Sequence, residues 1–152
     1  MLFISIYYFQ ITKIERFINA VYKLVFMTKL PAELTALVVD DEVPLRGILT
    51  RMLNRNGILN VDSVATTKEG IELLERKPYN LVFTDLNQQP SGIEVYRNAT
   101  SKGAQAYIMT GYSPDMSIAQ DVAKGHFLMK PSSLQEIDII IKEYIMSQNP
   151  QS

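Results

Sequence analysis

The sequence predicts an α/β protein whose parallel sheet is covered by helices on both faces. The first observation is a regular alternation, in which five short apolar runs are each followed by a segment with helical spacing. The second is the length of 152 residues, which suits one domain, and the third is a hydrophobic content of 47%, enough for a sizeable core. Strands that alternate with helices along the chain pair in parallel.

The predicted strands are short apolar runs that end in polar or turn residues. The first run is rich in β-branched residues and is followed at once by acidic residues, which is typical of a strand buried in a parallel sheet. The later runs end in a polar or turn residue in the same way. The expected strands cover residues 34–39, 61–65, 81–84, 104–109 and 127–129.

The predicted helices show apolar side chains at helical spacing and recognisable end signals. Pro44 suits the first turn of one helix, Thr66 can cap the next and Ser133 can cap the last. The fourth segment is polar, so we expect a weak helix there, ended by Gly125. The expected helices cover residues 43–56, 68–76, 91–101, 114–124 and 134–147.

The N-terminal segment has a different character from the rest of the chain. Residues 1–27 hold seven of the fourteen aromatic side chains, and no charge precedes Lys13. This uncharged stretch of 12 residues is shorter than a membrane span of about 20, and its positive charges follow it, unlike those of a signal peptide. Residues 4–25 carry apolar side chains at alternating spacings of three and four, which predicts an amphipathic helix.

Three interpretations of this helix are open. It packs on its own domain, it mediates self-association through residues 4–25, or natural translation starts at Met27. The expected organisation is therefore an N-terminal helix and linker at 1–30, a globular domain at 34–147 and a frayed tail at 148–152.

Composition excludes several kinds of site. The chain has no cysteine, which excludes disulfides, thiolate metal sites, iron–sulfur clusters and cysteine nucleophiles. The single histidine, His126, argues against a histidine-rich zinc or copper site, and its place after Gly125 predicts a turn residue. The 15 basic and 16 acidic side chains give a net charge of -1, so nothing indicates nucleic-acid binding.

Polar side chains gather where the predicted strands end. Ligands of open α/β sheets bind at the carboxyl ends of the strands. Carboxylates that converge there repel one another unless a cation neutralises them, and oxygen ligands favour Mg²⁺, Mn²⁺ or Ca²⁺. With an ammonium and a hydroxyl added, the set suits a phosphoryl group. The residues are Asp40, Asp41 and Glu42 after the first strand, Asp85 after the third, Thr110 after the fourth and Lys130 after the fifth. Asp41 taken singly is equally compatible with a helix N-cap.

Four stretches at these strand ends carry a family resemblance. They read ALVVDDE at 36–42, LVFTDL at 81–86, YIMTG at 107–111 and FLMKP at 127–131. With them, the chain resembles a response-regulator receiver domain, the chemotaxis-type module of two-component signalling, over residues 34–147. The resemblance implies a doubly wound, flavodoxin-like sheet with strand order 2-1-3-4-5.

The resemblance also implies a phosphoacceptor and a metal site. Asp85 would accept the phosphoryl group from a histidine kinase or a histidine phosphotransfer protein. Asp41, Asp85 and the backbone carbonyl of Asn87 would bind Mg²⁺ directly, and Asp40 would act through water. Lys130 would pair with a phosphoryl oxygen.

A switch is implied as well. Thr110 would turn its hydroxyl to the phosphoryl group, and Phe127 lies at the family's aromatic switch position. The Lys130-Pro131 bond is expected to be cis. Small Gly111 should leave the site open, with Tyr112 as a partial lid.

One loop departs from the family pattern. Pro90 follows the phosphoacceptor by five residues and Gly92 follows it by seven, whereas the family usually has proline at four and glycine at eight. The loop is one residue shorter, so its turn must differ. This places the Asn87 carbonyl in question as a metal ligand.

The expected function is that of a stand-alone cytoplasmic receiver that signals through a downstream protein target. Only 21 residues follow Pro131, room for one helix. It is expected to be no enzyme in the usual sense, although it would assist its own phosphorylation and dephosphorylation. The alternative is a phosphorylation-independent interaction module, which would usually lack Asp41, Asp85 or Lys130. A haloacid-dehalogenase-type phosphatase would need an aspartate at position 87, where the chain has asparagine.

Overall fold

The computed structural model describes residues 34–112, 120, 122–130 and 133–148, together with positions 14, 17 and 21. The chain divides into two units, Met1–Ala32 and Glu33–Ser152. In the first unit, Ile14, Phe17 and Val21 are helical and exposed. Gln148, the first residue of the tail predicted at 148–152, ends a helix, and the rest of that tail lies outside the described residues. The rest of the predicted helix at 4–25 also lies outside them, so self-association through residues 4–25 stays a prediction.

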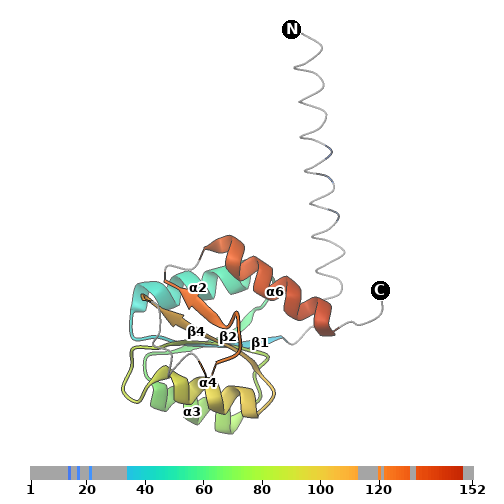
Figure 1. Ribbon diagram of the computed structural model, residues 1–152. Coiled ribbons are helices and arrows are strands. Elements are labelled where there is room, and N and C mark those ends of the chain that lie inside the picture. The colour runs from blue at the N-terminus through green and yellow to red at the C-terminus, as the bar shows by residue number, and fades with distance from the viewer. Residues whose placement is uncertain are drawn as a thin grey trace. The chain divides into compact units, whose positions relative to one another are not determined.

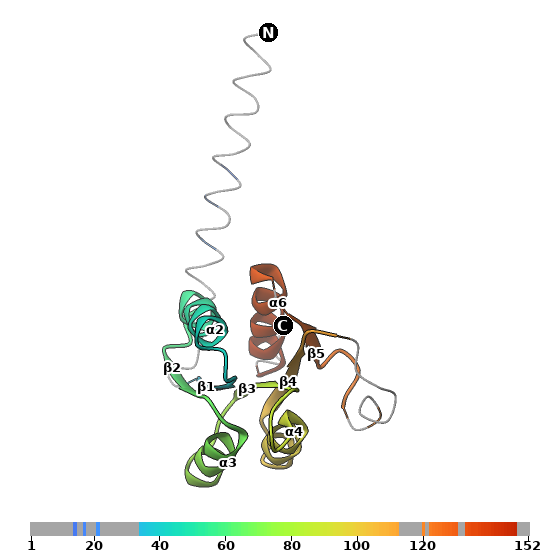
Figure 2. The same ribbon diagram turned by 90° about the vertical axis from the view of Figure 1, so that its left-hand side faces the viewer.

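The second unit contains a five-stranded parallel sheet in the order β2-β1-β3-β4-β5, which confirms the predicted fold and strand order. Figure 2 shows the strands side by side in this order. The sheet places β1 and β3, which carry the acidic residues, at its centre. The strands are β1 (Thr35–Val39), β2 (Asn60–Val64), β3 (Leu81–Asp85), β4 (Gln105–Thr110) and β5 (Phe127–Met129).

Helices cover both faces of this sheet. Figures 1 and 2 show α2 and α6 on one face and α3 and α4 on the other. Their N-terminal signals work as expected: Thr66 and Glu69 form a capping box at α3, and Ser133 Oγ accepts from the Glu136 amide at 3.1 Å in α6. The helices are α2 (Val43–Arg55), α3 (Thr67–Arg76), α4 (Gly92–Ser101) and α6 (Leu134–Gln148).

The predicted helix at 114–124 is wrong at its C-terminal end. Residues 122–125 form bends and turns, while 113–119 and 121 lie outside the described residues. One contact is tertiary: the Ala123 amide donates to the Tyr96 hydroxyl of α4 at 3.0 Å, so it is not paired within a helix. The other is a local turn, in which the Ala123 carbonyl accepts from the His126 amide at 3.0 Å.

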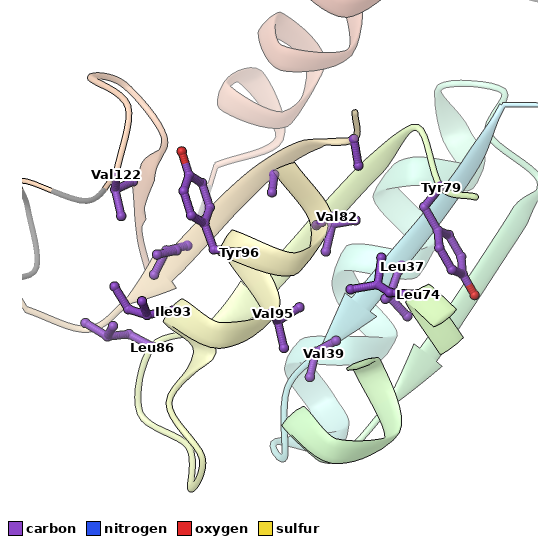
Figure 3. Close-up of a cluster of buried hydrophobic side chains, with 14 residues drawn as sticks. Leu37, Val39, Leu74, Tyr79, Val82, Leu86, Ile93, Val95, Tyr96 and Val122 are labelled. Carbon is purple, nitrogen blue, oxygen red and sulfur yellow. The ribbon is translucent and has the colours of Figure 1, made fainter. Parts of the chain in front are cut away.

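The core lies on both sides of the sheet. Figure 3 shows one part, where side chains of β1 and β3 meet those of α3 and α4. His126 lies in a turn, as predicted, but its ring also packs on Tyr107 at 4.9 Å between centroids and contacts the Tyr96 hydroxyl through Nδ1 at 3.3 Å. Among the described residues, no helix is long and apolar enough to cross a membrane.

Candidate functional site

The strand ends bring three carboxylates together. Asp40 and Asp41 follow β1, Asp85 ends the neighbouring strand β3, and one oxygen of each lies within 4.8 Å of the others. Asp40 and Asp85 are buried, whereas Asp41 is exposed. The central strands thus hold the acidic groups with one member open to solvent, where a ligand can reach it.

The Lys130 ammonium lies among these carboxylates. Its Nζ is 2.7 Å from Asp40 Oδ2 and 3.1 Å from Asp85 Oδ1, and exposed Glu42 contacts it at 3.4 Å. Burial by itself would lower the pKa of Lys130, but the carboxylates of Asp40 and Asp85 outweigh it and raise the pKa above its usual value. The side chain is therefore a fixed positive charge at neutral pH.

We call Asp40, Asp41, Asp85 and Lys130 the site cluster. Three carboxylates and one ammonium leave two negative charges uncompensated. Asp40 Oδ2 and Asp85 Oδ1 are buried, and within the described residues the Lys130 ammonium is the partner that each of them contacts. Oxygen ligands with this residual charge fit a divalent cation such as Mg²⁺.

The helix-cap interpretation of Asp41 is wrong. The N-cap of α2 is Glu42, which makes no side-chain cap hydrogen bond in the described structure. Asp40 instead holds this turn, since its Oδ1 accepts from the Glu42 amide at 2.8 Å. Asp41 is left as an exposed carboxylate beside two buried ones, which favours its interpretation as a ligand.

The backbone packs closely behind Asp85. A Cβ atom on Gly92 would lie 1.9 Å from the Asp85 carbonyl oxygen and 2.9 Å from Thr84 Oγ1, so no larger residue fits at the start of α4. The Leu86 amide donates to the Met109 carbonyl at 2.9 Å, which continues the β3–β4 pairing past Asp85. Asp85 therefore sits on a rigid backbone.

Thr110 is fully buried and its hydroxyl is engaged with its own loop. It donates to the Tyr112 carbonyl at 2.7 Å and accepts from the Tyr112 amide at 3.2 Å. The Lys130 amide donates to the Thr110 carbonyl at 2.8 Å, so the two strand ends are joined. Phe127 is half-buried against the core, and its pairing with Ile108 puts it on the same sheet face as Thr110.

Two loops meet at the exposed side of the site. The Tyr112 hydroxyl donates to Asn87 Oδ1, so the half-exposed ring reaches from the β4 end to the β3–α4 loop. No described atom lies within 4 Å of a Cβ placed on Gly111. The role of Tyr112 as a partial lid and that of Gly111 in keeping the site open stay predictions.

The β3–α4 loop has its own anchor, which the sequence did not reveal. The Gln88 carboxamide accepts from Thr67 Oγ1 at 2.9 Å and donates to the Ala65 carbonyl at 3.2 Å. The Gln89-Pro90 bond is cis. The Lys130-Pro131 bond, for which a cis form was predicted, lies outside the described residues.

Comparisons with known proteins agree with this fold. Residues 36–142 match the sequence model of the response regulator receiver domain. The chain is 30% identical over 122 residues to the response regulator protein PilR of Pseudomonas aeruginosa, covering 77% of this chain and 27% of PilR. It is 26% identical over 118 residues to the probable chemotaxis protein CheY of Rhizobium etli, covering 72% of this chain and 91% of that protein. The chain thus spans about a quarter of the length of PilR.

Solved structures show the same fold. The CheY-like receiver domain protein of Methanospirillum hungatei aligns with a TM-score of 0.68 at 24% identity, covering 79% of this chain and 100% of that one. A two-component response regulator of Clostridium difficile aligns with a TM-score of 0.67 at 21% identity, covering 77% and 99%. The family match covers most of the second unit and all the strand ends described above, and the chain therefore belongs to the response regulator receiver domain family.

Proposed function

We propose that this receiver accepts a phosphoryl group on Asp85 from a histidine kinase or a histidine phosphotransfer protein. Receiver domains are phosphoacceptor signalling domains that interact with histidine kinases and downstream targets, and they generally bind Mg²⁺ at an acidic site. The observation that carries the proposal is the buried Asp85 carboxylate, which lies beside the other two carboxylates and 3.1 Å from the Lys130 ammonium.

The groups of the site suit in-line transfer. A carboxylate oxygen of Asp85 attacks phosphorus, the phosphorus–nitrogen bond to the donor imidazole breaks, and the nitrogen keeps the electron pair. The Lys130 ammonium, already beside Asp85, is in reach of a phosphoryl oxygen. A bound Mg²⁺ supplies charge neutralisation on the phosphoryl oxygens; Asp41, Asp85 and the Asn87 carbonyl would hold it, with Asp40 acting through water.

The signal would pass through Thr110 and Phe127. The Thr110 hydroxyl now donates to the Tyr112 carbonyl. A phosphoryl group on Asp85 offers a charge-assisted hydrogen bond, which a neutral carbonyl does not, and this difference can shift a two-state equilibrium. Movement of the threonine vacates space on the sheet face that it shares with Phe127. A downstream target in the cytoplasm would read the altered surface, and the domain would assist its own dephosphorylation.

Mass spectrometry after incubation with acetyl phosphate and Mg²⁺ tests the proposal. We expect one acid-stable, base-labile phosphoryl group on the wild-type chain, none on Asp85→Asn and none in EDTA. Asp138→Asn is the matched control, because this carboxylate lies on α6 and outside the site cluster. Its oxygen accepts a hydrogen bond from the Asn56 side chain at 2.6 Å, and the amide oxygen of asparagine can accept the same bond. Full labelling of Asp85→Asn contradicts the proposal, because another residue then carries the phosphoryl group. An unlabelled wild type favours a receiver-like module that works without phosphorylation.

The variant Thr110→Ala distinguishes acceptance of the phosphoryl group from the conformational change that would follow it. It keeps every carboxylate of the site, so we expect it to accept the phosphoryl group. It loses the hydroxyl that would detect the group, so amide NMR shifts on β4 and β5 after beryllofluoride addition should shrink. Shifts equal to those of the wild type would show that Thr110 is not the switch.

A further inference from the structure

The β3–α4 loop is held from two sides by side-chain hydrogen bonds. On the β4 side, Asn87 accepts from the exposed Tyr112 hydroxyl. On the β2 side, the next residue, Gln88, bonds to Thr67 and to the Ala65 carbonyl. The peptide between Asn87 and Gln88 contains the carbonyl group proposed as a metal ligand, so these anchors act on the two residues that determine its direction.

The Gln88 anchor is the buried one. Gln88 is 9% exposed and Thr67 is 0% exposed, whereas Tyr112 is 54% exposed. A buried carboxamide is costly unless it is hydrogen-bonded, and here its oxygen accepts one bond and its nitrogen donates another. The buried hydrogen bond between Thr67 and Gln88 should therefore keep its geometry. In the exposed bond between Tyr112 and Asn87, water competes for the same donor and acceptor.

The anchor joins the loops that follow the two strands on either side of β1. In the sheet, β1 lies between β2 and β3, so a bond from the loop after β3 to the residues after β2 spans the end of β1. The end of β1 carries Asp40 and Asp41. The anchored loop therefore follows the strand that neighbours the end of β1, and the carboxylates there would share a cation with it.

We propose that Gln88 is a positioning residue for the divalent cation. Through Thr67 and Ala65 it holds the loop so that the Asn87 carbonyl faces the carboxylates, and it thereby sets the metal affinity. This inference rests on the proposed function, because it assumes that the site cluster binds Mg²⁺. Residues behind a ligand commonly have this effect, and their replacement typically weakens metal binding about 10- to 100-fold.

Calorimetric titration of the metal-free protein with Mg²⁺ tests the role. Thr67→Val removes the hydroxyl at nearly constant shape, and Gln88→Leu removes the carboxamide from the other side. We expect each to weaken Mg²⁺ binding about 10-fold, and the double variant to be no weaker than either single one. Thr67→Ser keeps the donor and should bind nearly as well as the wild type.

The opposite end of the sheet offers a matched control. Thr35 Oγ1 donates to the Asn80 carboxamide at 3.1 Å, the same kind of bond as that from Thr67 to Gln88. Thr35→Val should lower the stability of the metal-free protein to denaturant but leave the Mg²⁺ affinity unchanged.

The possible failures are distinguishable. If Thr67→Val and Gln88→Leu lower metal-free stability but bind Mg²⁺ like the wild type, the anchor is merely structural and the inference is overturned, while the proposed metal site stands. If the wild type itself does not bind Mg²⁺, the metal site fails and the inference fails with it. Weakened binding in both variants, with Thr67→Ser and Thr35→Val unaffected, supports the positioning role.

Discussion

The site cluster and a second charged cluster, formed by Asp62, Lys77 and Tyr79, differ in how their charges are balanced. In this Asp62 cluster, Lys77 Nζ lies 2.5 Å from Asp62 Oδ2, the Tyr79 hydroxyl donates to the same oxygen, and the ammonium lies 5.2 Å from the centre of the tyrosine ring. One carboxylate meets one ammonium. In the site cluster, three carboxylates stand against one ammonium, which contacts Asp40 and Asp85.

The pKa of Asp62 reflects this balance. Burial alone would raise the pKa of its carboxyl, but the bonds from Lys77 and Tyr79 hold it below its usual value. Burial and the neighbouring carboxylate raise the pKa of Tyr79. The Asp62 cluster is thus complete in the folded chain and contributes to stability. The site cluster retains repulsion between like charges, which a bound cation would relieve.

We expect the largest change in stability from a substitution that disturbs the close packing behind Asp85. It tests whether the site cluster depends on packing as well as on charge. Gly92→Ala places a Cβ 1.9 Å from the Asp85 carbonyl oxygen, so the backbone behind Asp85 must move. We expect a loss of about 3 kcal/mol in the free energy of unfolding, measured with urea. Gly111→Ala, beside the same site, is the control. It should change the free energy of unfolding by less than about 0.5 kcal/mol. Equal effects would mean that the close approach is unimportant.

The next prediction compares one carboxylate from each cluster without metal. Asp62→Asn removes the charge that Lys77 and Tyr79 share, and we expect a loss of about 1 kcal/mol, the small value reflecting a partly exposed ion pair. Asp41→Asn removes one of three repelling charges, so urea unfolding should give an unchanged or slightly higher stability. A clear loss in Asp41→Asn would contradict the imbalance described for the site cluster.

The variants Asp41→Asn and Asp62→Asn should also respond differently to millimolar Mg²⁺. A ligand that binds only the folded state raises the melting temperature. We expect this rise in the wild type and in Asp62→Asn, but not in Asp41→Asn, because only the last lacks a proposed ligand. Differential scanning calorimetry measures it. A similar rise in all three proteins would show that Mg²⁺ acts elsewhere than at the site cluster.

The smallest expected effect is the pH dependence of the Asp62 cluster. The pKa of Asp62 is lower in the folded chain than its usual value of 3.8, so its stabilisation is fully present above that pH and is lost as pH falls through the folded value. The stability difference between wild type and Asp62→Asn should therefore be constant from pH 7 to about pH 5 and shrink below about pH 4. A constant difference down to pH 2 would show that the pair does not lower this pKa.

The sequence by itself determined the order of the elements and the groups at the strand ends. Apolar runs, helical spacing and caps such as Thr66 are local patterns, and each depends on neighbours within about one turn of chain. The alternation of strands and helices leaves few topologies, so the convergence of Asp40, Asp41 and Asp85 also followed from the order of residues.

Only the tertiary structure decided how these groups are held. Thr67 and Gln88 are 21 residues apart, Asn87 and Tyr112 are 25 apart, and Tyr96 and His126 are 30 apart. None of these pairs leaves a local signal, because a glutamine in a loop or a histidine in a turn is ordinary until its partner is known. Another contact between distant segments, from the Ala123 amide to the Tyr96 hydroxyl, accompanies the turn that stands where the weak helix at 114–124 was predicted to end. Hydrogen bonds between distant segments depend on the packed arrangement of all the elements, and local propensity yields to them.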